Sequence, residues 1–337
     1  MLLKTILLAV GALTLTALVW HIGPARILDA AAQVGPLGLV VVLLPSLVMY
    51  LLEAYGWKLT MGTYAGAVSF PRLLAIRTAG EVVNMTTPTA YVGGEPLKAY
   101  LLKRYQVPFV DGLASVVLAK TVMTIAQVLF ILLGLVVALW LLGSEGSSGQ
   151  MVVASVVSVG VLAFGVAGFV AVQRWGLFTG LLGLMRRAHL RVAYLEAREG
   201  KLHELDRTIL NFYAKDRWNF LRSTGLYFGG WLAEALEVYV MLAYLGAPVT
   251  LPVSLAIGAL SAFIKGGTFF IPGSLGAQDG GNLLLVTAFG YSDVAGITFA
   301  LLRRFREIVW IGIGLLCLSF VGGRPAASAS DDMQRSS

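Results

Sequence analysis

Charged residues are scarce in this chain: only 13% of its 337 residues are Asp, Glu, Lys or Arg, whereas 58% are hydrophobic. Soluble proteins contain about 25% charged and roughly 45–50% apolar residues. The mean hydropathy of +0.81 is therefore typical of a chain that is mostly surrounded by lipid. This composition excludes a nucleic-acid-binding module, a disulfide-stapled domain and an ordinary cytosolic enzyme.

Residues that commonly bind metals or act as nucleophiles are also few. The single cysteine, Cys317, cannot form an intrachain disulfide, and the three histidines are scattered at His21, His189 and His203. No spacing of His, Cys, Asp or Glu is typical of a metal site. The glycine-rich sequence GGEPLK lacks the GK[ST] ending of a phosphate-binding loop. We therefore expect no metal, no cofactor, no ATP hydrolysis and no catalytic residues.

Long apolar runs indicate where the chain can cross a membrane, because a crossing helix needs about 20 apolar residues. Six runs qualify, at 3–20, 36–57, 111–142, 151–173, 224–246 and 295–321. The first run is longer than the roughly 7–15 residues of a signal-peptide core, so we interpret it as a retained helix. Residues 22–35 fit a short interfacial segment. Seven aromatic residues are interpreted as anchors in the headgroup layer: Tyr50, Tyr55, Trp57, Tyr64, Trp218, Tyr227 and Trp231.

The distribution of basic residues predicts the orientation. Residues 174–222 hold ten of the 25 basic residues and five acids, whereas 143–150 contains no Lys or Arg. Basic residues gather on the cytoplasmic side of membrane proteins, so this stretch and both termini are predicted to be cytoplasmic. We expect a single membrane domain over 1–324 in the bacterial cytoplasmic (inner) membrane, followed by a disordered tail over 325–337.

Two stretches, 72–105 and 252–290, do not fit as simple spans. In each, an apolar segment of helical length meets a break rich in Gly and Pro, and a second apolar segment follows. Backbone outside a helix persists at membrane depth only where protein or water satisfies its polar groups. We therefore predict an all-α membrane protein with about six full spans and two re-entrant helical hairpins.

An offset of 184 residues aligns the two broken stretches without a gap. The aligned positions share their chemistry: Pro88 with Pro272, Glu95 with Asp279, and Lys120 with Arg304. The predicted spans on either side give the two hairpins opposite orientations. The chain is thus predicted to contain an inverted repeat, about 36–142 and 224–321, and transporters often place the substrate site where such repeats meet.

Charged residues within the apolar stretches are candidates for a site, because a charge at the bilayer centre costs about 2.5–3.5 kcal/mol on insertion scales. They either neutralise one another as structural pairs or bind a polar ligand near the helix breaks. Arg306 and Glu307 share a helical face with Arg303. Together with residues at the breaks, the candidate substrate-binding set is Glu53, Glu81, Pro88, Gly94, Glu95, Lys98, Lys120, Glu234, Glu237, Lys265, Pro272, Gly273, Gly276, Asp279, Arg303 and Arg304.

The sequences TTPTAYVGGEPLKAYLL and FIPGSLGAQDGG resemble the flippase-like membrane-domain family named for lysylphosphatidylglycerol synthase. The resemblance covers about residues 36–321. In the first half it rests on Pro88, Gly94, Glu95, Lys98 and Leu101, and in the second on Pro272, Gly273, Gly276 and Asp279. Two features depart from the family: the spacing between Pro88 and Glu95 is longer than usual, and Asp279 replaces a more usual Glu.

The resemblance implies that the chain moves a polar-headgroup lipid between leaflets, as the membrane domain of the fused synthases is thought to do. The lipid would be a phospholipid, a polyprenyl-linked lipid or a hopanoid-type lipid, and some stand-alone relatives accompany hopanoid synthesis. No soluble transferase follows residue 324, so aminoacyl transfer is not expected.

We therefore expect a flippase-like transporter, not an enzyme, whose partners are membrane lipids. A homodimer and an association with a lipid-synthesis enzyme both stay open. One alternative is a membrane-embedded enzyme in which Glu81, Glu95 and Asp279 carry out acid–base chemistry on a lipid. The other is an accessory subunit of an enzyme that makes envelope lipids.

Overall fold

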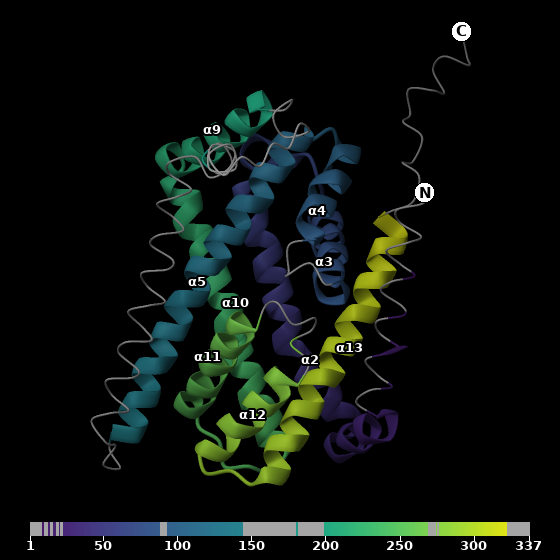
Figure 1. The fold of residues 1–337 in the computed structure, drawn as a ribbon, viewed down its shortest axis with the longest axis vertical. Helices are drawn as coiled ribbons and strands as arrows, with labels where there is room; N and C mark the ends of the chain where they lie inside the picture. Colours follow the sequence, from purple (N-terminus) through teal and green to yellow (C-terminus); the bar gives the residue numbers. More distant parts are fainter. Residues whose placement is uncertain are drawn as a thin grey trace, which may run out of the picture.

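The structure is a computed structural model that describes residues 23–87, 93–143, 199–268, 274 and 276–321, with isolated positions at 9, 13, 16, 17, 20 and 180. The described elements are all helices, which confirms the all-α prediction (Figure 1). Apart from the isolated positions, the predicted spans 3–20 and 151–173 lie outside the described residues. So do the 144–150 loop, the tail 325–337, Pro88, Pro272 and Gly273.

Four long helices form the frame of the molecule: α2 (Pro24–Thr60), α5 (Phe109–Gly143), α10 (Arg217–Tyr244) and α13 (Asp293–Val321). Three stretches among the described residues are long and apolar enough to cross a membrane: Ala32–Thr60, Phe109–Leu141 and Arg217–Tyr244. They correspond to the predicted spans 36–57, 111–142 and 224–246. α13 has a sufficient length of 29 residues but carries four charged residues near its middle.

A single glycine divides α2 into two parts. Gly35 has a φ angle of 73°, a left-handed conformation that glycine adopts without a steric penalty. The part before it, residues 24–34, matches the short segment predicted at 22–35, and Pro36 begins the longer part. α2 ends at Thr60 and is followed by η1 (Gly62–Gly66).

Each predicted hairpin contains two helices separated by a break. α3 (Phe70–Thr86) is followed by α4 (Gly94–Leu102) and η2 (Lys103–Tyr105), and α11 (Leu251–Gly267) is followed by α12 (Ala277–Ala288). Asn84 links the first two arms, because its Nδ2 donates to Glu95 Oε1 at 3.0 Å and its Oδ1 accepts from Gly94 N at 2.7 Å. Between α11 and α12, Ser261 Oγ donates to Asn282 Oδ1 at 2.7 Å.

The two helix pairs lie at opposite ends of the molecule (Figure 1). α5 begins beside α4 and runs along α11, whereas α13 begins beside α12 and runs along α3. α2 and α10 pack against each other through the middle, and each also contacts the helix pair that follows it. The helices of the first half therefore make the same pattern of contacts as the corresponding helices of the second half.

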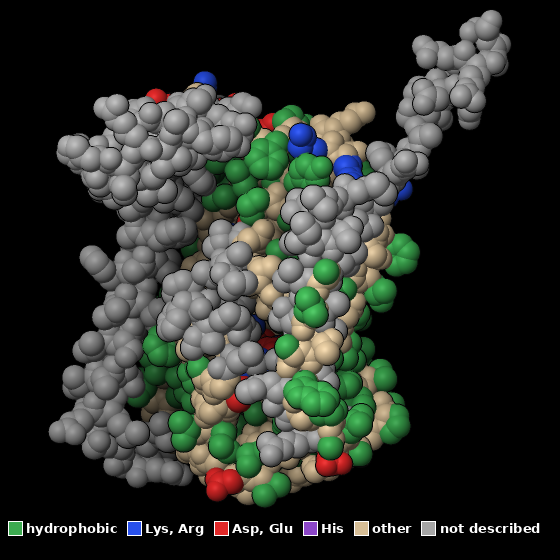
Figure 2. Space-filling model, turned by 45° about the vertical axis from the view of Figure 1, so that its right-hand side comes forward, with side chains coloured by type: hydrophobic (Ala, Val, Ile, Leu, Met, Phe, Trp, Pro, Cys, Tyr) green, Lys and Arg blue, Asp and Glu red, His purple; other side chains and the backbone are tan. Residues whose placement is uncertain are grey.

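The end that holds α3 and α4 is also the basic end. The described part of the predicted loop 174–222 forms α9 (Glu199–Lys215) and the start of α10. α9 packs Leu205 and Ile209 against Ala114 and Leu118 of α5. Exposed Lys and Arg side chains are visible at this end, and exposed Asp and Glu side chains at the opposite end (Figure 2).

Four of the seven aromatic residues interpreted as interface anchors are buried instead: Tyr50, Trp57, Tyr227 and Trp231. Trp57 is 2% exposed, and its Nε1 donates to Ser115 Oγ at 3.3 Å. Tyr55 and Trp218 are exposed, as an anchor requires. A ring with one polar atom suits a core position with a hydrogen-bond partner as well as it suits the headgroup layer, so the residue type alone could not separate the two.

Glycines allow α5 and α13 to approach the first arm of the opposite helix pair. A Cβ atom on Gly134 of α5 would lie 2.0 Å from the Cβ of Ala259, and one on Gly314 of α13 would lie 2.7 Å from the Cβ of Val82. Gly312, two residues earlier on α13, faces open space. Small residues at such contacts favour helix association in membranes, where lipid surrounds the helices.

We predict that Gly134→Ala and Gly314→Ala each lower the thermal stability of the purified protein in detergent. Overpacking of a tight contact costs about 1–3 kcal/mol. Gly312→Ala is the matched control and should be neutral or stabilising, because Ala is favoured over Gly in an open helix position by about 1 kcal/mol. Equal unfolding temperatures for the Gly312 and Gly314 variants would contradict the described contact between α13 and α3.

Candidate functional site

The charged residues predicted within the membrane gather inside the helix bundle. Nine of them are at most 8% exposed: Glu53, Glu95, Lys98, Glu234, Glu237, Arg303, Arg304, Arg306 and Glu307. Glu81, Lys120, Lys265 and Asp279 are partly exposed. A few charged side chains are visible at mid-height in Figure 2. Charges away from water require partners. Many of these charged residues line two adjacent cavities.

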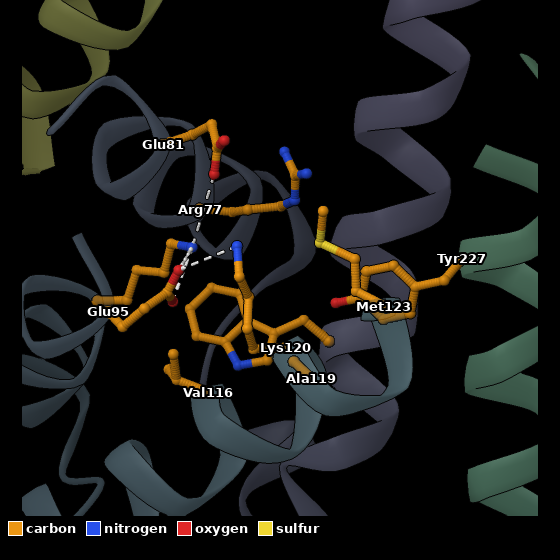
Figure 3. A pocket seen from close by; sticks show the side chains of 10 residues that line it. Arg77, Glu81, Glu95, Val116, Ala119, Lys120, Met123 and Tyr227 are labelled. Carbon is orange, nitrogen blue, oxygen red and sulfur yellow. Dashed lines mark hydrogen bonds and ion pairs between the residues drawn. The ribbon is translucent and has the colours of Figure 1, made fainter. Parts of the chain in front are cut away.

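The first cavity lies beside the first helix pair (Figure 3). Lys98 Nζ lies 3.0 Å from Glu95 Oε2 and 3.9 Å from Glu81 Oε2. Lys120 of α5 reaches Glu95 Oε1 at 4.0 Å, and its side chain is 38% exposed. The lining residues are Trp57, Arg77, Glu81, Glu95, Lys98, Val116, Ala119, Lys120, Met123 and Tyr227. Among the cations that line this cavity, Lys120 is therefore the most exposed and has the most distant ion-pair partner.

The second cavity is adjacent, since it shares Arg77, Glu81 and Met123 with the first. Helices from both halves of the chain line it. Its lining residues are Met49, Tyr50, Glu53, Arg77, Glu81, Met85, Met123, Trp231, Glu234, Lys265, Arg306, Glu307 and Trp310.

Arg77 of α3 stands between the two cavities. Its guanidinium forms an ion pair with Glu53 of α2 and lies 4.6 Å from the centre of the Tyr50 ring. Figure 3 shows this guanidinium turned away from Glu95 and Lys120. Arg77 precedes Glu81 by four residues, a spacing that places both side chains on one helical face.

Arginines of α13 hold the carboxylates of α10. Arg303 Nη2 donates to Glu234 Oε1 at 2.5 Å, and Arg303 Nη1 donates to Ser261 Oγ of α11. Arg306 Nη1 donates to Glu237 Oε2 at 2.9 Å. Glu237 is fully buried. These contacts join α10, α11 and α13 at the second cavity, which Glu234 and Arg306 line.

The acid and the cation that the offset of 184 aligns lie close to each other in both halves. Arg304 Nε and Nη2 donate to the two oxygens of Asp279 at 2.7 and 2.8 Å, and the equivalent Lys120 lies 4.0 Å from Glu95. The surroundings differ, because Glu95 and Lys120 line the first cavity whereas Asp279 and Arg304 line neither cavity.

The predicted candidate residues divide into three groups. Seven line a cavity: Glu53, Glu81, Glu95, Lys98, Lys120, Glu234 and Lys265. Four form ion pairs outside the cavity walls: Glu237, Asp279, Arg303 and Arg304. Two act through their backbone, since Gly94 packs against Gly80 of α3, and Gly276 N donates to Asp279 Oδ2 at 3.0 Å.

Sequence reasoning did not include several cavity residues in the candidate set: Tyr50, Trp57, Arg77, Met123, Tyr227, Trp231, Arg306, Glu307 and Trp310. Two signals were available for the charged ones. Arg77 lies one turn before Glu81, and Arg306 and Glu307 share a face with Arg303. Nothing in the sequence separates the buried aromatic residues from those at an interface.

Comparison with known proteins covers nearly the whole chain. Residues 2–314 match the family described as "Lysylphosphatidylglycerol synthase TM region". A UPF0104 membrane protein of Methanothermobacter thermautotrophicus is 27% identical over 342 residues, which cover 97% of this chain and 98% of the relative. A second UPF0104 membrane protein of that organism is 27% identical over 292 residues, covering 82% of this chain and 79% of the relative.

No solved structure matches the chain. The family match begins before α2, extends into α13 and includes both cavities and the two helix pairs. It agrees with the resemblance found in the motifs at residues 86–102 and 270–281. This integral membrane protein belongs to the lysylphosphatidylglycerol synthase transmembrane-region family.

Proposed function

We propose that this protein is a flippase-type lipid translocator, which moves a polar headgroup between leaflets while the acyl chains stay in the bilayer. The observation that carries the proposal is the pair of adjacent polar cavities, bounded by helices of both halves in a largely apolar chain. A headgroup that crosses hydrocarbon needs such an enclosure, because polar groups without partners cost several kcal/mol there. Membership in a family named for a lipid-modifying synthase supports the same class of substrate.

In this proposal the helix pairs α3–α4 and α11–α12 are two re-entrant hairpins of an inverted repeat, set among about six spans. Their places at opposite ends of the molecule and their matching contacts support this arrangement. Transporters with inverted repeats expose a central site to either side when one repeat rocks against the other. The second cavity meets that requirement, since its walls come from α2, α3, α5, α10, α11 and α13.

The proposed orientation places the basic end on the cytoplasmic side of a bacterial cytoplasmic membrane. Lys58, Arg72 and Lys103 lie at the ends of α2, α3 and α4 that adjoin this end. Basic residues at short loops set the orientation of membrane proteins. Both chain termini are then cytoplasmic as well.

Cysteine labelling tests this orientation on a Cys317→Ala background. Lys103 follows α4 and Thr250 precedes α11, and both are exposed. We expect Lys103→Cys to react with a membrane-impermeant maleimide only from the cytoplasmic side, and Thr250→Cys only from outside. Labelling of both positions from one side would rule out the proposed topology.

Glu95→Gln tests the first cavity. The substitution removes a charge but keeps the volume, and the Gln side-chain oxygen can still accept hydrogen bonds from Asn84 and Lys98, so we expect the variant to fold. Transport of labelled lipids in proteoliposomes should fall about tenfold, because a hydrogen bond to a charged group contributes about 1.5–3 kcal/mol. Asp111→Asn, in the first turn of α5 and at neither cavity, is the control and should leave transport unchanged.

The same proteoliposome assay separates transport from chemistry. Lipids recovered after translocation are analysed by mass spectrometry. We expect an altered distribution between leaflets with no covalent change. A modified lipid that depends on Glu95 would instead support the membrane-enzyme alternative.

Lys98→Met and Lys120→Met remove the same charge near Glu95 but should differ in effect. Lys98 bonds both oxygens of Glu95, at 3.2 and 3.0 Å, and breaking a buried pair costs about 3–5 kcal/mol. Lys120 is farther away and more exposed, so its removal should cost less than about 1 kcal/mol of stability while lowering transport. Thermal unfolding and transport of both variants check this, and equal destabilisation would contradict it.

A further inference from the structure

The second cavity contains hydrogen-bond donors without partners. Among the buried polar atoms of the described residues, Arg77 Nη1, Trp231 Nε1 and Arg306 Nε make no hydrogen bond. All three residues line this cavity. Arg77 and Trp231 are only 7% and 6% exposed. A buried donor without a partner costs roughly 1–3 kcal/mol, so three donors at one cavity require an explanation.

Lys265 adds a positive charge to the same wall. It lies in the last turn of α11 and lines the cavity. It forms no ion pair with another described residue, and the lining carboxylates Glu81 and Glu234 have Lys98 and Arg303 as their ion-pair partners. A lysine ammonium supplies three donors, which increases the surplus of donors at this cavity.

The carboxylates that line the cavity already have cationic partners. Glu53 pairs with Arg77, Glu234 with Arg303, and Glu307 with Arg304. Glu81 lies 3.9 Å from Lys98. The unused hydrogen-bonding capacity among the described lining residues is therefore mainly that of donors, and an occupant that accepts hydrogen bonds would satisfy it.

A purely structural role explains only part of this pattern. A lysine in the last turn of a helix interacts favourably with the helix dipole, and this alone could account for Lys265. It does not account for Arg77 of α3 and Trp231 of α10. These residues belong to other helices, yet both line the same cavity and each carries a buried donor without a partner.

We propose that the second cavity binds a phosphate-type anion through Lys265, Arg77 Nη1 and Trp231 Nε1. Phosphate oxygens accept several N–H donors at once, and charged donors make these bonds short and strong. This inference deepens the proposed function and rests on it for the source of the anion, the phosphate of a lipid headgroup. Free inorganic phosphate offers the same chemistry, so the test includes both.

Thermal unfolding of the full-length protein in an uncharged detergent provides the test. Three probes are titrated: short-chain phosphatidic acid, a diacylglycerol with the same chains, and inorganic phosphate. A ligand that binds the folded protein raises its unfolding temperature in proportion to occupancy. We expect phosphatidic acid to stabilise the protein and the diacylglycerol, which lacks the phosphate, to have little effect.

Two variants locate the site. Lys265→Met and Trp231→Phe should each weaken the apparent affinity for phosphatidic acid about tenfold, the loss expected for one hydrogen bond to a charged group. Trp231→Phe keeps an aromatic ring against Phe130, so it still tests the site if Lys265→Met does not fold. Lys265→Arg keeps the positive charge and should bind phosphatidic acid. Lys103→Met removes an exposed charge elsewhere and should change nothing.

Unchanged affinity in both cavity variants would overturn the anion site, as would equal stabilisation by the diacylglycerol. Binding of inorganic phosphate as tight as that of phosphatidic acid would support the site and assign free phosphate as its ligand. The transport assay is independent of this measurement. If the protein binds phosphatidic acid at Lys265 but moves no lipid, the anion site stands and the proposed function is wrong. If transport is intact but both variants bind phosphatidic acid normally, the proposed function stands and the anion site is wrong.

Discussion

Burial of charge away from water is the constraint on which the rest of this structure depends. α13 carries three arginines that are at most 5% exposed, and each must meet a carboxylate because breaking a buried pair costs about 3–5 kcal/mol. Arg303 and Arg306 therefore hold α13 against Glu234 and Glu237 of α10. Lipid provides little hydrophobic drive for helices to associate. These pairs, together with the close glycine contacts, fix the helices around the cavities.

The two halves neutralise the aligned acids, Glu95 and Asp279, with different cations. Lysines surround Glu95 in the first half, whereas Arg304 holds the equivalent Asp279 with two parallel hydrogen bonds. An arginine fork fixes both partners, while a lysine ammonium on a flexible stem changes partners readily. The pair of Arg304 with Asp279 is therefore the more rigid of the two, and the lysines beside Glu95 are freer to change partners.

Much of the architecture could be predicted from the sequence, because a long apolar run indicates a helix in lipid and a segment rich in Gly and Pro indicates where a helix breaks. The helix breaks between α3 and α4 and between α11 and α12, and the pairing of Lys120 with Glu95 and of Arg304 with Asp279, all agree with the offset of 184. The burial of Trp57 and the pairing of Arg77 with Glu53 could not be predicted. Both depend on which helix faces meet, and a single sequence does not record helix rotation.

The boundary between the two cavities consists of three long, unbranched side chains. Arg77, Glu81 and Met123 line both cavities, Glu81 has its nearest cation 3.9 Å away, and an unbranched methionine adapts easily to a new neighbour. In the proposed function, a phosphate that leaves Lys120 for Lys265 would pass this boundary by exchanging ion-pair partners. The firm arginine pairs of α13 would meanwhile keep the surrounding helices in place, so the hydrocarbon stays sealed while the headgroup moves.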